Sequence, residues 1–277
     1  MTLNELYVKG KNALSDAKIE GAQVAADMIF EQVFGMGRIE RIKNGGVAAD
    51  ERSLLFESKI NDRLTGIPLQ YILGGWEFCG LRFAVDSSVL IPREETALLC
   101  DTVLENASEK AVILDLCSGS GAVGVTLAKK LPHSRVVCAE LSDEAIITLK
   151  KNIEINSAEN AEALRLDVLG DWEKLPEADI IAANPPYIAT RDLDSLQTEV
   201  RFEPKMALDG GEDGLLFYRA IAEKSPRKLK PGGLLSVEIG YNQAAAVSAL
   251  FAQSGFKNIT VLKDINWCDR VMIANMV

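Results

Sequence analysis

The spacing of apolar residues changes after the first quarter of the 277-residue chain. In that first quarter, apolar positions recur every three or four residues, for example at Ala26, Ile29, Phe30 and Val33. This period is typical of helices that bury one face. We therefore expect residues 1–73 to form a small helical domain.

A short stretch with a period of two follows. In residues 74–90, apolar side chains occupy alternate positions on both sides of Gly80 in the segment WEFCGLRFAV. Such alternation around a glycine predicts a β-hairpin. We expect this hairpin to connect the helical domain to a second domain at residues 91–277.

The second domain alternates apolar strands with helices. We expect strands, in chain order, at AVILDLC, RVVCAEL, AEALRLDV, ADIIAANPP, GGLLSVEIG, KNITVLKD and DRVMIANMV. Helices are expected from Ala122, from Asp143, at 214–229 and from Asn242. This alternation predicts an α/β fold with a seven-stranded, mostly parallel sheet and helices on both faces. Few residues join the last two strands, so these strands should pair antiparallel.

Composition narrows the possible functions. The chain is 48% hydrophobic, no apolar run reaches about 18 residues, and the N-terminus lacks a signal-peptide pattern, so we expect a cytoplasmic protein without a membrane partner. A net charge of −10 opposes contact with a phosphate backbone, and we expect no stable binding of nucleic acid. The five cysteines form no C-x-x-C pair and His133 is the one histidine, so we expect no metal site.

The end of the first strand of the predicted sheet carries a candidate nucleotide site. Ligands of such sheets bind at the carboxyl ends of the strands. Asp115 lies there, and Glu140 ends the next strand, where its carboxylate can accept hydrogen bonds from both hydroxyls of a ribose. Small residues in the turn after the first strand let the backbone approach a ligand, and unpaired amides follow at a helix N-terminus. The turn residues are Cys117, Ser118, Gly119, Ser120 and Gly121.

Two nucleotides suit such a turn, NAD and an adenosyl methyl donor. A diphosphate site favours the pattern G-x-G-x-x-G, whereas this chain reads C-S-G-S-G-A-V-G with Asp115 two residues before it. A carboxylate at that position repels a diphosphate and attracts a cationic sulfonium or its amino group. We therefore expect S-adenosylmethionine as the cofactor and S-adenosylhomocysteine as its product.

A second motif, Asn184, Pro185, Pro186 and Tyr187, ends the fourth strand at the same edge. The prolines hold the backbone extended and remove two N–H donors. The side-chain oxygen of Asn184 and the carbonyl of Pro185 can then accept both hydrogens of a planar –NH2 group, while Tyr187 offers it a flat wall. Holding that nitrogen against a sulfonium methyl promotes methyl transfer through proximity and orientation, without requiring a dedicated general base.

With these motifs the chain resembles the HemK/PrmC family, the N5-glutamine methyltransferases of peptide chain release factors. The matching segments are PLQYILGGWEFCGLRFAVDSSVLIPREET, ILDLCSGSGAVGVTLA, ANPPYI, EPKMALDGGEDGL, LKPGGLLSVEIG followed by Gln243, and DRVMIA. The resemblance implies a Rossmann-like class I methyltransferase domain and an N-terminal helical bundle that helps to recognise the substrate. It implies that this substrate is a class 1 peptide chain release factor, methylated at the glutamine of its Gly-Gly-Gln motif.

The resemblance also implies roles for particular residues. The cofactor would be held by the turn from Cys117 to Gly121 and by Glu140, with Asp167 and Val168 at the end of the third strand beside the adenine. We expect Asp115 and Asn184 to contact the cofactor as well. The glutamine amide would be held by the segment from Asn184 to Tyr187.

The chain departs from the family pattern at three places. Cys117 and Ser118 stand where the family usually has glycine and threonine, and both remain small. Ala97 stands where members often have a last acidic residue. Val168 replaces a frequent tryptophan, so contact with adenine there would be aliphatic.

Other functions are compatible with parts of this pattern. A glutamine methyltransferase acting on a ribosomal protein would share the motifs, and the Asn-Pro-Pro-Tyr motif occurs also in adenine-N6 DNA methyltransferases. The charge of −10 and the lack of an added basic domain argue against DNA. A non-catalytic module that binds S-adenosylmethionine would not need the amide-orienting motif. We expect an enzyme that acts as a monomer on a release factor.

Overall fold

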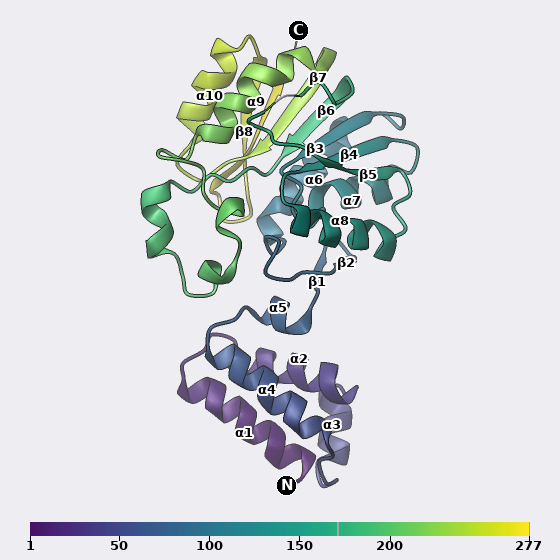
Figure 1. Cartoon of the computed structure of the whole chain (residues 1–277), viewed down its shortest axis with the longest axis vertical. Helices are drawn as coiled ribbons and strands as arrows, with labels where there is room; N and C mark the ends of the chain where they lie inside the picture. Colours follow the sequence, from purple (N-terminus) through teal and green to yellow (C-terminus); the bar gives the residue numbers. More distant parts are fainter. Residues whose placement is uncertain (171, 277) are drawn as a thin grey trace. The chain divides into compact units, whose positions relative to one another are not determined.

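The computed structural model describes residues 1–170 and 172–276, and its chain divides into two compact units (Figure 1). The first unit comprises Met1–Gly75 together with Gln197–Phe202. The second comprises Trp76–Leu196 and the chain from Glu203 onward. The hairpin that we expected to be a connector is therefore grouped with the second unit. Segment 197–202, which the apolar period did not mark, is grouped with the helices.

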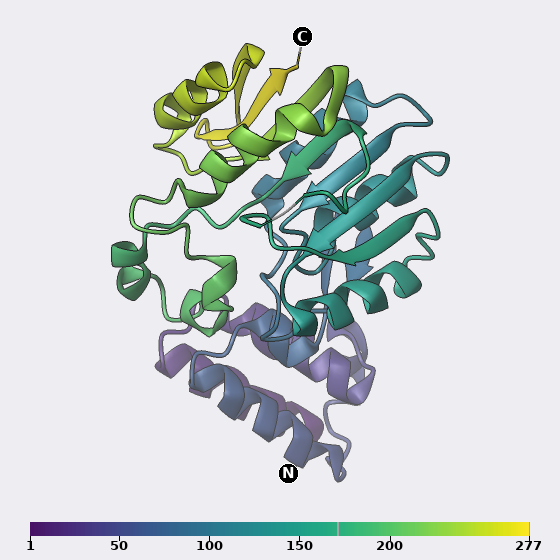
Figure 2. The ribbon, with the colours of Figure 1, turned by 45° about the horizontal axis from the view of Figure 1, so that its top comes forward.

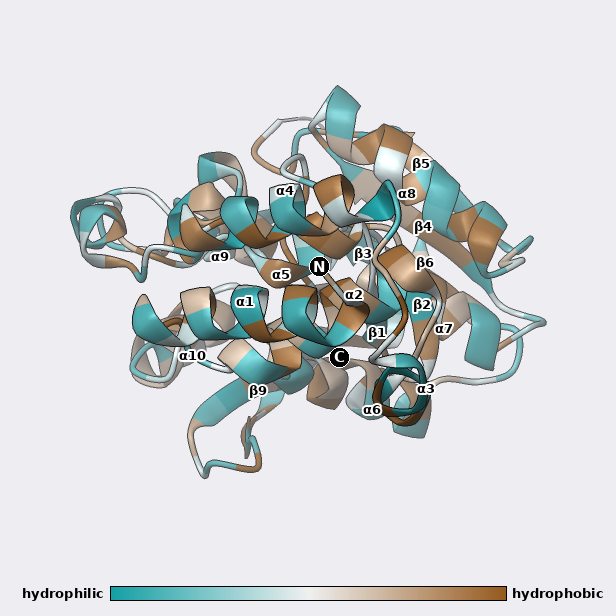
Figure 3. Ribbon diagram, turned by 90° about the horizontal axis from the view of Figure 1, so that it is seen from below, coloured by the Kyte–Doolittle hydropathy of each residue, from teal (hydrophilic) through white to brown (hydrophobic). Residues whose placement is uncertain are grey.

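Helices build the first unit, as their apolar period predicts. They are α1 (Leu3–Asp16), α2 (Ala22–Phe34), α3 (Arg38–Asn44), α4 (Arg52–Leu64) and α5 (Leu69–Leu73). Thr2 and Glu5 form a capping box that satisfies free N–H groups at the start of α1. Helices α1 and α4 each carry hydrophobic positions between hydrophilic ones (Figure 3). The core is aromatic: the ring of Phe30 lies 5.9 Å from that of Tyr7 and 5.7 Å from that of Phe56.

The segment 197–202 is attached to the first unit by charge and by close packing. Glu199 forms an ion pair with Arg63, whose side chain is only 4% exposed. The methyl group of Thr198 lies 2.9 Å from the position that a Cβ at Gly66 would take, and Gly66 has a φ of +97°. A glycine is required at position 66 because any side chain there would displace the segment.

Within residues 1–170 and 172–276, seven strands of the second unit form one sheet with the order β5-β4-β3-β6-β7-β9-β8. They are β3 (Val112–Leu116), β4 (Arg135–Glu140), β5 (Ala161–Arg165), β6 (Ala178–Ala183), β7 (Leu229–Glu238), β8 (Lys257–Lys263) and β9 (Asp269–Asn275). Strands β3 to β7 pair in parallel, and β9 pairs antiparallel with both β7 and β8. The predicted mostly parallel sheet with an antiparallel last pair is confirmed. Val277, expected at the end of the last strand, lies outside the described residues.

The hairpin and the remaining helices complete the second unit. Strands β1 (Trp76–Phe78) and β2 (Leu81–Phe83) pair antiparallel around Gly80, as predicted. The helices are α6 (Ala97–Asn106), α7 (Ala122–Lys130), α8 (Asp143–Ile155), α9 (Leu216–Lys224) and α10 (Ala244–Gln253). Helix α9 is shorter than the predicted 214–229, since Pro226 falls in a 3-10 turn where an α-helix cannot continue. Helix α10 begins two residues after the expected Asn242.

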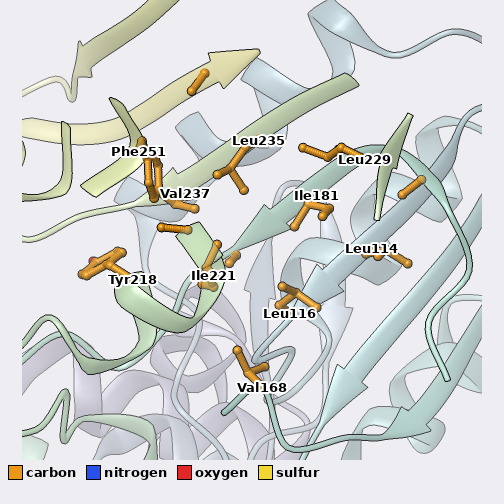
Figure 4. Packing of buried hydrophobic residues seen from close by; sticks show 14 of the residues in the cluster. Leu114, Leu116, Val168, Ile181, Tyr218, Ile221, Leu229, Leu235, Val237 and Phe251 are labelled. Atoms are coloured by element: carbon orange, nitrogen blue, oxygen red, sulfur yellow. The ribbon is translucent and has the colours of Figure 1, made fainter. Parts of the chain in front are cut away.

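Side chains from the two sides of the sheet pack against different helices. Leu114 and Leu116 belong to a buried cluster that includes Tyr218 of α9 and Phe251 of α10 (Figure 4). Figure 2 shows the green helix α9 in front of the strands. Asp115, between the two leucines, faces α7 instead. The predicted cover of helices on both faces is therefore confirmed.

No helix in the described part of the chain combines the length and the apolar character needed to cross a membrane.

Candidate active site

The turn after β3 has a backbone that few side chains tolerate. Cys117, Gly119 and Gly121 have φ values of 58°, 53° and 81°, all in the left-handed region. The Ser118 hydroxyl donates to the backbone oxygen of Asp115 at 2.7 Å, and the Ser118 N–H donates to the oxygen of Ala139 at 3.1 Å. These bonds fold the chain tightly between β3 and α7. Within the turn Cys117 and Gly119 are partly exposed, whereas Ser118, Ser120 and Gly121 are buried.

Asp115 acts inside the protein as well as at the edge of the site. Its side chain is 1% exposed, and its Oδ2 accepts a hydrogen bond from the N–H of Gly124 in α7 at 2.9 Å. A Cβ at Gly124 would lie 2.8 Å from that oxygen and 2.4 Å from the sulfur of Cys138, so the helix approaches β3 and β4 at its glycine. Burial raises the pKa of Asp115 to about 7, although the hydrogen bonds partly offset this effect.

Glu140 accepts hydrogen bonds from two backbone segments, the turn after β3 and the residues that follow β4. Its Oε2 accepts from the N–H of Gly119 at 2.8 Å, and its Oε1 accepts from the N–H groups of Leu141 and Ser142 at 2.8 and 2.9 Å. Each carboxylate oxygen can accept more than one hydrogen bond. Three of its roughly four acceptor sites are thus used by the protein, and one, on Oε2, remains for a ligand hydroxyl while the orientation of Glu140 is fixed.

The side chain of Asn184 is oriented by a hydrogen bond to Thr96. Its Nδ2 donates to the hydroxyl oxygen of Thr96 at 3.2 Å, and the Thr96 hydroxyl donates to Oε2 of Glu238 at 2.7 Å. Because the amide nitrogen is engaged by Thr96, the side-chain oxygen of Asn184 stays available on the other side. This is the group that the sequence suggests as an acceptor for substrate.

The Pro186–Tyr187 backbone is supported by a glycine-rich loop. A Cβ at Gly210 would lie 2.8 Å from the Pro186 oxygen, and one at Gly214 would lie 2.4 Å from the Tyr187 oxygen. Gln243 binds the same region, since its Nε2 donates to the backbone oxygens of Tyr187 and Gly214 at 3.0 and 3.1 Å. The backbone after Asn184 is thus held on two sides by packing and hydrogen bonds.

A cavity of about 310 Å³ opens at this edge of the sheet. This volume is at the lower end of the range of small-molecule sites. Predicted site residues in its wall are Cys117, Gly119, Glu140, Asp167, Val168, Asn184 and Pro186. A smaller cavity of about 40 Å³ is lined by Asp115, Cys117, Ser118, Gly119, Ser120 and Asn184, so the two share part of their walls.

Three predicted residues lie elsewhere. Gly121, Pro185 and Tyr187 are not among the described residues that line either cavity. The Tyr187 ring packs against the buried cluster, and its hydroxyl lies 3.4 Å from Oε1 of Glu238. Burial raises the pKa of Tyr187 above its ordinary value. In this structure the ring therefore packs into the core next to the site, and it does not line the cavities as the flat wall that we expected.

Sequence reasoning gave no role to several residues of the site. Thr96 lies within the segment PREET and Glu238 at the end of SVEIG, both of which we used only to recognise the family. The position of Glu238 at the carboxyl end of a central strand is a signal that was available. Further residues in the wall of the larger cavity include Ser88, Thr190, Met206, Ala207 and Asp209.

The charges in the larger cavity discriminate between ligands. Its described lining residues include the carboxylates of Glu140, Asp167 and Asp209 and contain no lysine or arginine. Such a wall repels a diphosphate and suits a nucleoside with a positive charge. Val168, 4% exposed, and Leu141 add apolar surface for a base. The residues present fit an adenosyl sulfonium.

The sheet order and this cavity at the carboxyl edge define the class of Rossmann-like methyltransferases. Residues 94–265 match the family model described as "Methyltransferase small domain", and residues 5–74 match "PrmC N-terminal domain". A "Release factor glutamine methyltransferase" from Geobacter sulfurreducens is 40% identical over 275 residues, covering 98% of this chain and 95% of that protein. The chain belongs to the release factor glutamine methyltransferase family.

Further relatives and structures agree with this assignment. The protein of the same name from Clostridium botulinum is 36% identical and is matched over 99% of both chains. Among solved structures, a methyltransferase from Pyrococcus furiosus has a TM-score of 0.55 at 17% identity, over 71% of this chain and 89% of its own. The catalytic domain of hMettl16 has a TM-score of 0.61 at 15% identity, over 79% and 82%. These distant structures show the fold, which confirms the predicted class.

Proposed function

We propose that the protein transfers a methyl group from S-adenosylmethionine to the side-chain amide nitrogen of the glutamine in the Gly-Gly-Gln motif of class 1 peptide chain release factors. The observation that carries the proposal is Asn184, which lines both cavities while Thr96 engages its amide nitrogen. The family relationship supports the choice of substrate. We place the activity in the cytoplasm, in a protein that acts as a monomer.

The cofactor residues divide by chemistry. When bound, S-adenosylmethionine supplies a methyl group on a positively charged sulfur. Glu140 would hold the ribose, and Asp167 and Val168 would lie beside the adenine. The turn from Cys117 to Gly121 holds the amino-acid part, near Asp115 in the smaller cavity. Arg93 also lines the smaller cavity, close to where the carboxylate of the amino-acid part would lie, whereas the described lining of the larger cavity has carboxylates and no lysine or arginine.

Asn184 and Pro185 present the nucleophile. An amide nitrogen is a weak nucleophile because its lone pair is delocalised into the carbonyl group. The Oδ1 of Asn184, which lines both cavities, accepts one N–H group. The carbonyl of Pro185, although Pro185 is not among the described lining residues of either cavity, is our expected acceptor for the second N–H group. Together they direct one face of the nitrogen toward the methyl carbon. Bound S-adenosylmethionine would supply the methyl carbon and leave as S-adenosylhomocysteine, and the nitrogen of the glutamine amide would give up one proton to solvent. Fixed acceptors stabilise the positive charge that develops on nitrogen.

The test is methyl transfer from labelled S-adenosylmethionine to an unmethylated release factor. The matched substrate is the same factor with its Gly-Gly-Gln glutamine changed to alanine, and the matched enzyme is Asn184→Ala. We expect label only in the combination of intact factor and wild-type enzyme, with cofactor affinity of Asn184→Ala within about threefold of wild type. Label in both factors would contradict the assigned atom. Label in neither factor would redirect the search to ribosomal proteins, then to DNA.

A further inference from the structure

Glu238 lies behind Asn184 and outside the cavities. It ends β7, is 2% exposed, and is not among the described residues that line either cavity. Its Oε2 accepts from the Thr96 hydroxyl at 2.7 Å, and its Oε1 accepts from the Tyr187 hydroxyl at 3.4 Å. Any influence of Glu238 on the reaction must therefore pass through neighbouring side chains.

The hydrogen count at Thr96 decides how Asn184 is oriented. A threonine hydroxyl has one hydrogen to donate, and an ionised carboxylate can only accept. Once Thr96 donates to Glu238, its oxygen can only accept, and Asn184 must present Nδ2 to it, as observed at 3.2 Å. Thr96 is 3% exposed and reaches only the smaller cavity, which it lines together with Asn184. The ionised form of Glu238 thus selects one of the two orientations of the Asn184 amide.

We propose that Glu238 and Thr96 are positioning residues that hold Asn184 Oδ1 toward the substrate only while Glu238 is ionised. This inference rests on the proposed function, in which Asn184 Oδ1 accepts a hydrogen bond from the substrate –NH2 group. A protonated Glu238 has its own O–H to donate to Thr96. The Thr96 hydroxyl can then donate its hydrogen to Asn184 Oδ1, so the side-chain amide of Asn184 can rotate by 180°. The Asn184 nitrogen would then face the substrate –NH2 group. Both groups are hydrogen-bond donors, so no hydrogen bond can form between them.

The groups around Glu238 place this change near neutral pH. Burial raises the pKa of Glu238 to about 7, with Glu95 adding to the rise. Arg270 of β9 and the hydroxyls of Thr96 and Tyr187 act in the opposite direction. Tyr218 of α9 donates to the backbone oxygen of Glu238 at 2.8 Å, which fixes the residue in place. The active orientation is therefore favoured above about pH 7 and lost below it.

The first test is kcat at saturating cofactor and release factor from pH 6 to 8.5. Wild type should lose about tenfold in kcat as the pH falls through 7. Thr96→Val should lower kcat at pH 8 by roughly 10- to 100-fold while cofactor affinity changes less than about threefold, and Thr96→Ser should restore most of it. Glu238→Gln should lose this pH dependence, because a glutamine amide does not titrate in this range. Full kcat in folded Thr96→Val, or an unchanged pH profile in Glu238→Gln, would overturn the proposal.

The second test observes the amide itself and needs no turnover. In a ¹⁵N-labelled protein, the side-chain –NH2 resonances of Asn184, assigned by their loss in Asn184→Ala, should shift with a midpoint near pH 7. The shift should be absent in Glu238→Gln. Resonances that stay constant from pH 6 to 8.5 would refute the positioning role even if the release factor is methylated. A normal shift without methylation of the factor would instead count against the proposed substrate.

Discussion

Several side chains at the carboxyl edge of the sheet are bonded to the protein's own backbone. Glu140 accepts from three N–H groups, and Asp115 accepts from Gly124. Such bonds fix the orientation of a carboxylate without using all of its lone pairs. These residues have two roles: they stabilise the turn, and they bind a ligand. Substitutions here should therefore change the free energy of unfolding and the affinity for ligand by different amounts.

Gly121 is the first case. It has a φ of +81°, and a Cβ there would lie 2.4 Å from a methyl carbon of Leu149, whereas Gly119 also has a positive φ but open space around it. We expect Gly121→Ala to lower the free energy of unfolding by roughly 2 to 4 kcal/mol, through strain and overpacking, and Gly119→Ala by about 1 kcal/mol. Urea unfolding of both variants measures the difference. Equal losses would show that α8 moves aside freely.

Asp115 is the second case, and its effect depends on pH. The unfolded carboxyl ionises near pH 3.8, but the folded one keeps its proton to about pH 7, so stability from this group is lost as the pH rises between these values. Asp115→Asn should remove this dependence. The free energy of unfolding of Asp115→Asn minus that of wild type, measured without cofactor, should therefore be about 2 to 3 kcal/mol larger at pH 8 than at pH 5.

Tryptophan fluorescence is a suitable probe for this experiment, because Trp76, Trp172 and Trp267 all belong to the second unit. The exposed Asp101→Asn, in helix α6, serves as the control and should show no such change. A parallel pH dependence in wild type and Asp115→Asn would mean that other groups cause it.

At the scale of elements, helices and strands with a clear apolar period were predictable, whereas segment 190–209 was not. It contains the 3-10 turns Thr190–Ser195, Val200–Phe202 and Lys205–Ala207. Such turns have no apolar period, and their position depends on distant partners. Glu203, for example, pairs with Arg93 and accepts from the N–H of Ile91 at 3.1 Å, more than a hundred residues earlier. The motifs located the cofactor edge, but the supports of Asn184 come from the fold.

Gln243 links the start of α10 to the backbone that follows β6. It precedes α10 and bonds the Tyr187 and Gly214 backbones. We expect Gln243→Ala to lower kcat for methyl transfer by about tenfold, because the Asn184–Tyr187 backbone loses a fixed support, while cofactor affinity changes little. The exposed neighbour Asn242→Ala should behave like wild type in steady-state assays. A loss confined to cofactor binding would show that Gln243 acts elsewhere.

At the scale of the whole molecule, the sequence predicted a helical part and a sheet part but not how the chain is shared between them. The change of period indicated where the helices give way to the hairpin. The membership of 197–202 in the first unit depends on Arg63 and Gly66, which have no repeating pattern to reveal it. Long-range pairing of this kind is outside what local periodicity can report.

Ligand binding should stabilise the second unit, which contains both cavities. At a concentration of S-adenosylhomocysteine 100 times its Kd, its free energy of unfolding should rise by about 2.7 kcal/mol, followed by tryptophan fluorescence. At that same concentration Glu140→Ala should gain at least about 1.3 kcal/mol less, because loss of the ribose contacts weakens binding tenfold or more. Equal stabilisation of both proteins would show that Glu140 does not hold the ligand.

The shared segment 197–202 also limits how this protein can be recombined. A chimaera made by a single crossover near residue 75 would combine the helices of one relative with a copy of the segment from another. Glu199 and Thr198 would then face a foreign partner for Arg63 and Gly66. Exchange of the helical unit between relatives therefore requires two separate pieces of gene to move together, and covariation between residues 63–66 and 198–199 should mark this linkage across the family.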